Sequence, residues 1–248
     1  MSTVTLDFAD RVVSVRLRPS GEVFDGPFLE DLLAACGAVA ERDDVSVALL
    51  SAEESVFASE WAADLLNSSA ADQPLRACSA LAELPVPVVA AVGGQISGAG
   101  LELALACDLR LAAADARFAV TELTCGRLPA AGSIQRLARL VGRSWAAWLL
   151  LTGEAIDAGT AMSIGLVNAV QPADRLASEA EALARAIASR GPLAVRYAKE
   201  ALRQGLEMPL AQALQHELNL ATLLQTSRDR TEGVSAFLEK RSPEFRGE

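Results

Sequence analysis

The fold is decided in residues 88–108, which read VVAAVGGQISGAGLELALACD. The first five residues, 88–92, form a short, unbroken apolar run, which predicts a buried strand. Gly93 and Gly94 end the run, and small residues then lead into a predicted helix over 101–107. A turn of this kind gives a ligand access to free backbone N–H groups at the positive end of the helix dipole.

Two residues near this turn have the chemistry of a reaction site. Ala99 and Glu102 are three apart, so the amide of one and the carboxylate of the other share a face of the predicted helix. Acyl chemistry can use an N–H donor beside a carboxylate. The glycine spacing differs from the Gly-x-Gly-x-x-Gly pattern of dinucleotide-binding proteins. The spacing by itself favours a plain structural turn over a catalytic one.

The composition of the 248 residues limits the function. A net charge of −10 argues against a nucleic-acid partner, because phosphate binding needs a basic surface. The sequence contains one histidine, His216, which excludes His-dependent triads and His-rich metal sites and leaves acid–base chemistry to carboxylates or to less usual groups. The four cysteines lack paired spacing and predict thiols in a reducing compartment. Without a signal peptide or a run of transmembrane length, we expect a cytoplasmic protein.

Strand and helix patterns alternate through the first two thirds of the chain. Residues 4–8 and 12–17 alternate in polarity and predict a β-hairpin or two successive strands. A helical pattern over 28–40 separates the second of these strands from an apolar run at 45–50, which is the βαβ signal of a parallel sheet. A further helix is predicted over 74–84, with Leu75, Cys78 and Leu81 or Leu84 on its inner face.

Two glycines and a late apolar run organise the segment up to residue 170. Gly142 is predicted to separate two helices, and Gly165 to cap a helix over 158–164 in the left-handed conformation. Residues 166–170 predict a last strand.

The remainder of the chain is predicted to be helical. Its helical patterns cover 175–189, 193–204, 209–224 and 228–239. The composition changes near Gly191-Pro192, so we expect a core over residues 1–190 and a helical region over 191–248.

Four segments carry motifs that occur together in one family. Residues 87–108 combine a proline, an apolar strand, Gly-x-Gly-x-Glu-Leu-Ala and Cys-Asp. A second set consists of Phe118, Glu122, Gly126, Pro129, Gly132, Arg136 and Leu137. Thr-Gly at 152–153, Ala-x-x-x-Gly-Leu-Val at 161–167 and the charged tail 230–241 complete the pattern. On these residues the chain resembles the crotonase (enoyl-CoA hydratase/isomerase) superfamily.

The resemblance implies an α/β fold, a crotonase-like spiral of ββα units with a helical C-terminal region that forms homotrimers or hexamers. It implies an acyl-CoA thioester as substrate, with no metal and no cofactor beyond the coenzyme A of the substrate. The family's two catalytic glutamates fall on Glu102 and Glu122, which in hydratases hold a water between them. Two carboxyls in one apolar pocket do not readily ionise together, so one can keep a proton while the other acts as base. The implied reaction is hydration of the C2=C3 bond of a trans-2-enoyl-CoA.

The resemblance also implies how the thioester is held. Two backbone N–H groups, those of Ala99 and Trp61, would bind the carbonyl oxygen, where negative charge develops in the enolate. Lys240 would bind the phosphates of CoA as a point charge. The full set of implied substrate contacts is Arg18, Ala58, Ser59, Gly98, Gly132, Phe237 and Lys240.

The segment after Phe57 departs from the family pattern Phe-x-Ala-Gly-x-Asp-Leu. Without a gap, Glu60 stands in place of the glycine and Trp61 supplies the amide. A shift of two residues restores the aspartate as Asp64, with Ala63 at the amide. The size of Trp61 predicts a narrowed acyl pocket.

Three other functions are compatible with this sequence. Δ3-Δ2 enoyl-CoA isomerisation needs only one well-placed carboxylate to move the proton. The altered segment after Phe57 is also compatible with an acyl-CoA-binding protein of little or no turnover. The last alternative is an inactive paralogue that is retained as a trimer partner.

Overall fold

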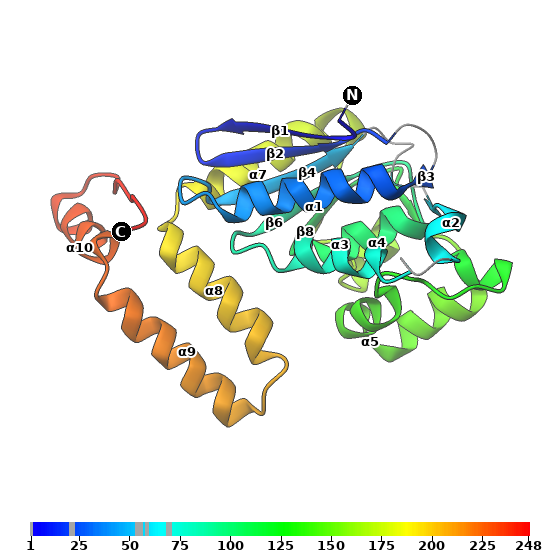
Figure 1. Ribbon diagram of the computed structural model, residues 1–248. Helices are drawn as coiled ribbons and strands as arrows, with labels where there is room; N and C mark the ends of the chain where they lie inside the picture. Colours follow the sequence, from blue (N-terminus) through cyan, green and yellow to red (C-terminus); the bar gives the residue numbers. More distant parts are fainter. Residues whose placement is uncertain (1, 20–22, 53–56, 58–59, 68–70) are drawn as a thin grey trace.

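The computed structural model describes residues 2–19, 23–52, 57, 60–67 and 71–248. Within these ranges the chain forms a mixed α/β core and a helical C-terminal region (Figure 1).

Six of the described strands form the main sheet, in the order β1-β2-β4-β6-β8-β11. Their bounds are β1 Val4–Ala9, β2 Val12–Leu17, β4 Val47–Ala52, β6 Val88–Val92, β8 Leu109–Ala113 and β11 Ala169–Gln171. β1 and β2 form the predicted antiparallel hairpin, and every later pair is parallel. All five residues of β6 are buried, as expected of a valine-rich strand at the centre of a parallel sheet.

Short strands lie beside the main sheet and complete a repeated unit. β3 (Val23–Phe24) pairs with β5 (Glu60–Trp61), while β7 (Gln95–Ile96), β9 (Arg117–Phe118) and β10 (Ile156–Asp157) form another small sheet. Along the chain a long strand, a short strand and then a helix recur, as in β2-β3-α1 and β6-β7-α4. This repeated ββα unit confirms the predicted spiral.

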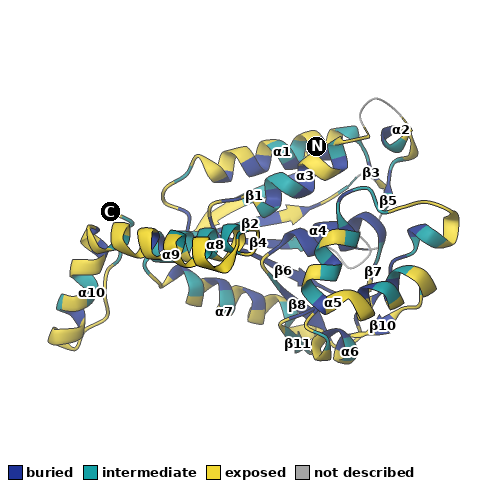
Figure 2. Cartoon of the chain, turned by 90° about the horizontal axis from the view of Figure 1, so that it is seen from below, coloured by how far each residue is buried: buried dark blue, intermediate teal, exposed yellow. Residues whose placement is uncertain are grey.

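Helices cover both faces of the main sheet (Figures 1 and 2). α1 (Gly26–Ala40), α3 (Gln73–Ala82) and α4 (Gly98–Ala106) contribute to the larger hydrophobic core on one face. On the other face, Ala180, Ala184 and Ala188 of α7 (Leu176–Ala188) pack on strands β4, β6 and β8. Every residue of α4 is buried, so the helix that carries Glu102 lies inside the protein.

The predicted inner face of α3 is partly wrong. Leu75 is 45% exposed, whereas Cys78, Leu81 and Leu84 are buried as predicted. The buried face of α3 consists of Pro74, Ala77, Cys78 and Leu81, which turns Leu75 outward.

The segment from α5 to β11 contains one confirmed break and one shifted strand. α5 (Ser133–Thr152) is interrupted at Gly142, whose φ of 77° separates the two predicted helices. α6 (Ala158–Ser163) is followed by Gly165 at φ 80°, the predicted left-handed cap. The last strand does not begin at Leu166, because the N–H groups of Leu166 and Val167 donate to Ala161 O and so end α6.

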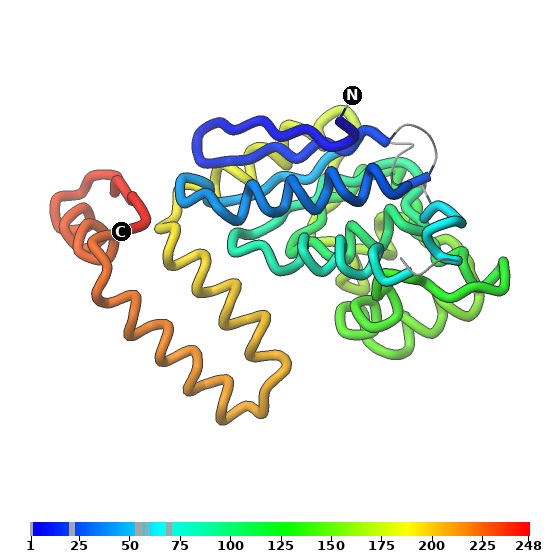
Figure 3. The backbone as a smooth tube through the Cα atoms, viewed as in Figure 1, coloured from blue at the N-terminus to red at the C-terminus, as the bar shows by residue number. Residues whose placement is uncertain are grey.

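Three helices extend from the core at the C-terminal end of the chain. α8 (Pro192–Gly205) and α9 (Leu210–Gln225) form an antiparallel hairpin, and α10 (Arg228–Glu239) follows (Figure 1). The tail after α10 turns back to its first turn, where the N–H of Arg228 donates to Glu248 O (Figure 3). Among the described residues, no helix is both long and apolar enough to span a membrane.

Candidate active site

The first turn of α4 presents unpaired backbone N–H groups inside the protein. The first intrahelical bond runs from Leu101 N–H to Ser97 O, so Gly98, Ala99 and Gly100 precede it. None of these three N–H groups bonds to a described residue, and no described side chain caps the helix. Ala99 is fully buried. An oxygen that accumulates negative charge is favoured at such a helix end.

The chain at Phe57 crosses directly over this turn. Ser97 N–H donates to Phe57 O at 2.9 Å. A Cβ atom at Gly100 would lie 2.1 Å from the same oxygen, so this approach requires glycine. The two segments expected to hold the thioester oxygen are therefore in contact. The proposed substrate contacts Ala58 and Ser59 lie outside the described residues.

Glu102 is a fully buried carboxylate with a donor on each oxygen. Its Oε1 accepts from the backbone N–H groups of Ala131 at 2.7 Å and Ser133 at 3.2 Å. Its Oε2 accepts from the indole Nε1–H of Trp61 at 2.6 Å. All three contacts come from N–H donors, so both oxygens of Glu102 act as acceptors. A surface position for this residue is excluded.

Glu122 is buried beside Glu102 in a different environment. It opens a 3-10 turn, η2 (Glu122–Cys125), and only 6% of it is exposed. Its Oε2 has no hydrogen-bond partner among the described residues. Burial raises the pKa of Glu122, and the negative charges of Glu102 and Glu60 raise it further. The structure therefore brings the two predicted glutamates together, and the pKa of Glu122 is raised there.

Trp61 lies in β5, directly before α2 (Ala63–Leu66). Ala62 N–H donates to Phe24 O of β3 at 3.0 Å, so the preceding N–H, that of Trp61, is directed away from β3. The indole is buried and packs against Phe24, with ring centroids 5.5 Å apart. The amide and the size of Trp61 were predicted to matter, whereas the hydrogen bond from its indole to Glu102 was not predicted.

Glu60, the neighbour of Trp61, faces the segment that carries Glu122. Its Oε1 accepts from Thr121 Oγ1 at 3.4 Å, and its Oε2 lies 3.3 Å from an Arg127 guanidinium nitrogen. The only sequence feature that pointed to this contact was the presence of Glu60 where the family pattern has glycine. Of the two residues of β5, Trp61 contacts Glu102, and Glu60 contacts residues close in sequence to Glu122.

The loop before α5 holds Glu102 by its backbone. Gly132, with φ 99°, lies between the two residues whose N–H groups donate to Glu102 Oε1. The guanidinium of Arg136 donates to Ala131 O. A Cβ atom at Gly132 would lie 2.8 Å from a nitrogen of that guanidinium. Gly132 was predicted from the sequence, but these two donors were not. Every residue except proline has a backbone N–H group, so the residue type does not show which of them donates.

The other predicted substrate contacts lie apart from Glu102. Exposed Arg18 lines a cavity of about 370 Å³ between the sheet and α7. On α10, Phe237 is 82% exposed, and Lys240 ends the helix in the left-handed conformation. α10 lies at the opposite end of the molecule from α4 (Figures 1 and 2), so one chain alone does not bring these residues to the site.

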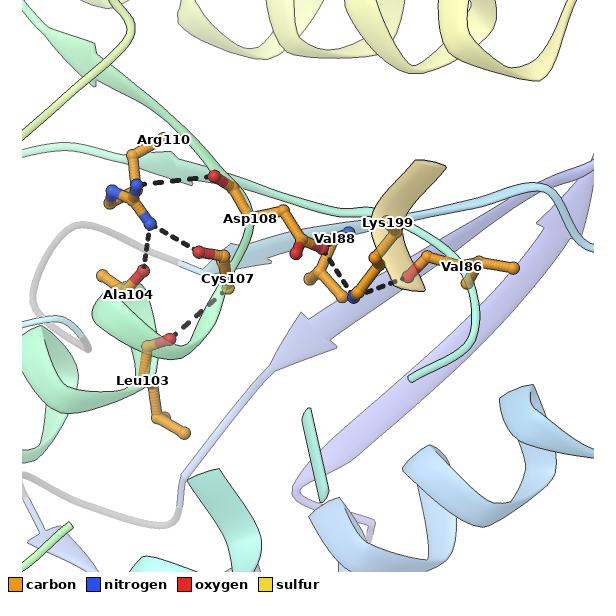
Figure 4. A network of polar contacts seen from close by, with 8 residues as sticks. All are labelled: Val86, Val88, Leu103, Ala104, Cys107, Asp108, Arg110 and Lys199. Atoms are coloured by element: carbon orange, nitrogen blue, oxygen red, sulfur yellow. Dashed lines mark hydrogen bonds and ion pairs between the residues drawn. The ribbon is translucent and has the colours of Figure 1, made fainter. Parts of the chain in front are cut away.

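A polar network fixes the C-terminal end of α4 (Figure 4). The buried Arg110 guanidinium donates to Ala104 O and Cys107 O at the end of the helix, and to Leu166 O at 2.8 Å. Next to it, Lys199 of α8 contacts Asp108 Oδ2 at 2.6 Å. This network ties the helix that carries Ala99 and Glu102 to strand β8 and to the C-terminal region.

Acidic and sulfur side chains do not converge into a metal site in the described part of the chain. Within it, no three His, Cys, Asp or Glu residues are grouped so that they could hold a metal ion. Cys36, Cys78 and Cys107 are buried free thiols, as predicted, and burial raises the pKa of Cys107 to about 12. The expectation of no cofactor stays a prediction.

Comparisons with known proteins place the chain among its relatives. The family model described as enoyl-CoA hydratase/isomerase matches residues 11–248. A 2,3-dehydroadipyl-CoA hydratase of Escherichia coli is 39% identical and covers 100% of both chains. A probable enoyl-CoA hydratase of Mycobacterium leprae is 37% identical over 98% of this chain and 97% of its own.

A solved structure extends the comparison to three dimensions. The enoyl-CoA hydratase of Bacillus anthracis superimposes with a TM-score of 0.93 at 35% identity, over 99% of this chain and 100% of that one. The fold, the buried glutamates beside a helix N-terminus and these full-length relatives lead to one assignment. The chain belongs to the enoyl-CoA hydratase/isomerase family, the crotonase superfamily.

Proposed function

We propose that the protein is an enoyl-CoA hydratase that adds water across the C2=C3 bond of a trans-2-enoyl-CoA. The observation that carries this proposal is the contrast between its two buried glutamates. Glu102 accepts hydrogen bonds on both oxygens, whereas burial raises the pKa of Glu122. A base and a proton donor in one site are what hydration of a conjugated thioester needs.

The thioester oxygen binds the N–H groups of Ala99 and Trp61 in this mechanism. Negative charge moves to that oxygen as water attacks C3, and preorganised N–H donors stabilise the enolate. The N-terminus of α4 adds the favourable end of its dipole at Ala99. A donor of this kind contributes roughly 2.7–4 kcal/mol of transition-state stabilisation.

Glu102 and Glu122 move the two protons of the reaction. Glu102 takes a proton from water as the oxygen bonds to C3, and Glu122 gives its proton to C2. The product carries a C3 hydroxyl and a new C2–H bond, and the pair has exchanged its protonation states. Proton exchange with water then restores Glu122 for the next turnover.

The names of the relatives support the substrate class. The Escherichia coli relative is named for a 2,3-dehydroacyl thioester, and relatives from other organisms are named as enoyl-CoA hydratases. A 2,3-unsaturated acyl-CoA is therefore the substrate we assign to this chain. The bulk of Trp61 beside Glu102 supports a narrow acyl site.

We also propose that the working form is a homotrimer or a hexamer built by α8, α9 and α10. α9 carries a stripe of exposed leucines, Leu210, Leu214 and Leu218, at helical spacing. Phe237 and Lys240 lie far from Glu102 of their own chain, so a neighbouring subunit is where they would reach CoA. A cytoplasmic location remains a prediction.

The decisive experiment follows the loss of conjugated-enoyl absorbance with crotonyl-CoA and longer trans-2-enoyl-CoA thioesters. Glu102→Gln and Glu122→Gln are each expected to lower kcat by about 100-fold or more, since each removes a proton-transfer group. Glu154→Gln, at an exposed position, is the matched control. Full activity in either site variant contradicts the proposal.

Isomerisation of 3-enoyl-CoA to 2-enoyl-CoA is the second candidate. It is favoured by one observation: Glu102 is occupied by three described donors, while Glu122 Oε2 has no partner among the described residues. One free carboxyl suffices to move a proton between C2 and C4. Conversion of a 3-enoyl-CoA that survives Glu102→Gln but not Glu122→Gln would identify this activity.

A further inference from the structure

We propose that Trp61 is a positioning residue whose indole N–H orients Glu102 and so determines where the attacking water binds. This inference rests on the proposed hydratase function and deepens it. The family pattern has no fixed side chain at this position, so the role belongs to this chain. It depends on the indole and is separate from the use of the Trp61 amide.

The hydrogen bonds of Glu102 leave little room for water. A carboxylate offers about four acceptor positions, two on each oxygen. Counting the described residues, Ala131 and Ser133 use both positions of Oε1, and Trp61 uses one of Oε2. The remaining position on Oε2 is where a water can donate. Trp61 therefore defines a single water position on the base.

Glu122 is the group that we assign to the other side of that position. Its Oε2 is buried and has no partner among the described residues. Since the charge of Glu102 acts on Glu122, we place Glu122 as the second partner of a water that donates to Glu102 Oε2. Removal of the indole N–H frees a second position on Oε2, and water then has two ways to bind.

The indole is held firmly enough to orient a carboxylate. Only 4% of Trp61 is exposed, and its backbone is paired to β3 at Phe24. Its ring lies against Phe24, which stacks on Phe28 with centroids 4.1 Å apart and planes 8° from parallel. Asp25 caps α1 by accepting from Phe28 N–H at 3.0 Å. Residues 24–28, distant in sequence from Trp61, thus fix the donor.

The same ring limits the acyl group. It fills space next to the carboxylate that acts at C3, so substituents near C3 compete with the indole for volume. The N–H and the bulk of Trp61 are separable by substitution, because phenylalanine keeps an aromatic ring without the donor and alanine removes both.

The test combines kinetics with the NMR signal of the indole. Trp61→Phe is expected to lower kcat by about 10-fold or more, because the hydrogen bond from the indole to the Glu102 carboxylate is lost. KM should change less than about twofold, because the phenylalanine ring still fills the space beside the acyl group. Trp61→Ala is expected to lower kcat similarly and to raise the relative rate on enoyl-CoA thioesters with bulkier acyl groups. Trp148→Phe, at a half-exposed position on α5, is the control and keeps parental kinetics.

The contact itself is tested without turnover. The sequence has three tryptophans, so the three indole N–H signals are assigned by Trp61→Phe, Trp145→Phe and Trp148→Phe. Glu102→Gln is expected to move the Trp61 signal and leave the other two in place. Because this readout does not depend on activity, it separates failure of this inference from failure of the hydratase proposal.

Three results would overturn the inference. One is parental kcat in Trp61→Phe. Another is a Trp61 indole signal that does not respond to Glu102→Gln. The third is a loss of thermal stability and of CoA-ester binding in Trp61→Phe that accounts for its whole loss of rate, which would make Trp61 a packing residue only.

Discussion

At the scale of single residues, the two buried glutamates lie in different surroundings, because Glu102 has N–H donors on both oxygens and Glu122 Oε2 has no partner among the described residues. Glu122 keeps its proton to higher pH than an ordinary carboxyl, because burial raises its pKa. The unfolded chain loses that proton near pH 4.5. Between pH 4.5 and the higher folded-state pKa, the folded protein binds more protons than the unfolded chain, so its free energy of unfolding falls as the pH rises.

We expect Glu122→Gln to remove this pH dependence. The variant should lose less thermal stability than the parent between pH 4.5 and neutrality, because an amide has no proton to lose. Thermal unfolding measured at several pH values checks the expectation. The parental slope retained in Glu122→Gln would show that another group is responsible.

Gly100 has a structural role because the backbone of Phe57 lies directly against it. We expect Gly100→Ala to destabilise the protein by about 1–3 kcal/mol and to lower kcat, since its Cβ would lie 2.1 Å from Phe57 O. Gly37→Ala in α1 is the control, because no atom lies within 4 Å of the new Cβ. Denaturant unfolding and hydratase assays measure both, and equal stability of the two variants would contradict the argument.

The sequence predicted which glutamates meet but not what surrounds them. Glu102 and Glu122 were identified by motif, and burial supports the choice. The indole contact of Trp61 joins residues 41 positions apart and depends on the pairing of β3 with β5, which short-range pattern does not encode. The donors Ala131 and Ser133 act through backbone N–H groups, which any residue supplies except proline.

At the scale of elements, α4 is fixed at both ends. Phe57 lies over its first turn, and Arg110 binds the carbonyls of its last turn. The positions of Ala99 and Glu102 therefore depend on residues outside the helix. The unbroken apolar run of β6 and the helical pattern of α10 were predicted with accurate bounds. β11 was placed too early, because the apolar pair Leu166-Val167 is a buried helix end.

We expect Arg110→Met to lower the free energy of unfolding by about 3 kcal/mol or more, because several buried carbonyls lose their donor at about 1–3 kcal/mol each. Lys199→Met is the comparison. Asp108 is partly exposed and keeps its bond from Val88 N–H, so the loss should be smaller. Urea unfolding measures the loss of stability in both variants. A larger loss in Lys199→Met than in Arg110→Met would show that the network does not stabilise α4 as described.

At the scale of the whole molecule, the C-terminal helices leave apolar surface exposed. α9 contacts α8 on one side, while Leu210, Leu214 and Leu218 are 74%, 57% and 58% exposed. A stripe of this kind on a single chain indicates an interface. The division of the chain at Gly191-Pro192 stays a prediction.

We expect the protein in solution to have three or six times the monomer mass of 26.0 kDa. The double variant Leu214→Asp and Leu218→Asp should shift it towards the monomer, because two charges would enter the apolar interface. Gln215→Asp on the same helix is the matched control. Light scattering coupled to size-exclusion chromatography measures the mass, and an unchanged mass in the double variant would exclude this stripe from the interface.

The central claim is tested most directly by the mass of the product formed from crotonyl-CoA in water enriched in oxygen-18. We expect a thioester heavier by one labelled water, formed by the parent and not by Glu102→Gln or Glu122→Gln. Crotonyl-CoA recovered unchanged, or a product without labelled oxygen, would contradict hydration by this pair of glutamates.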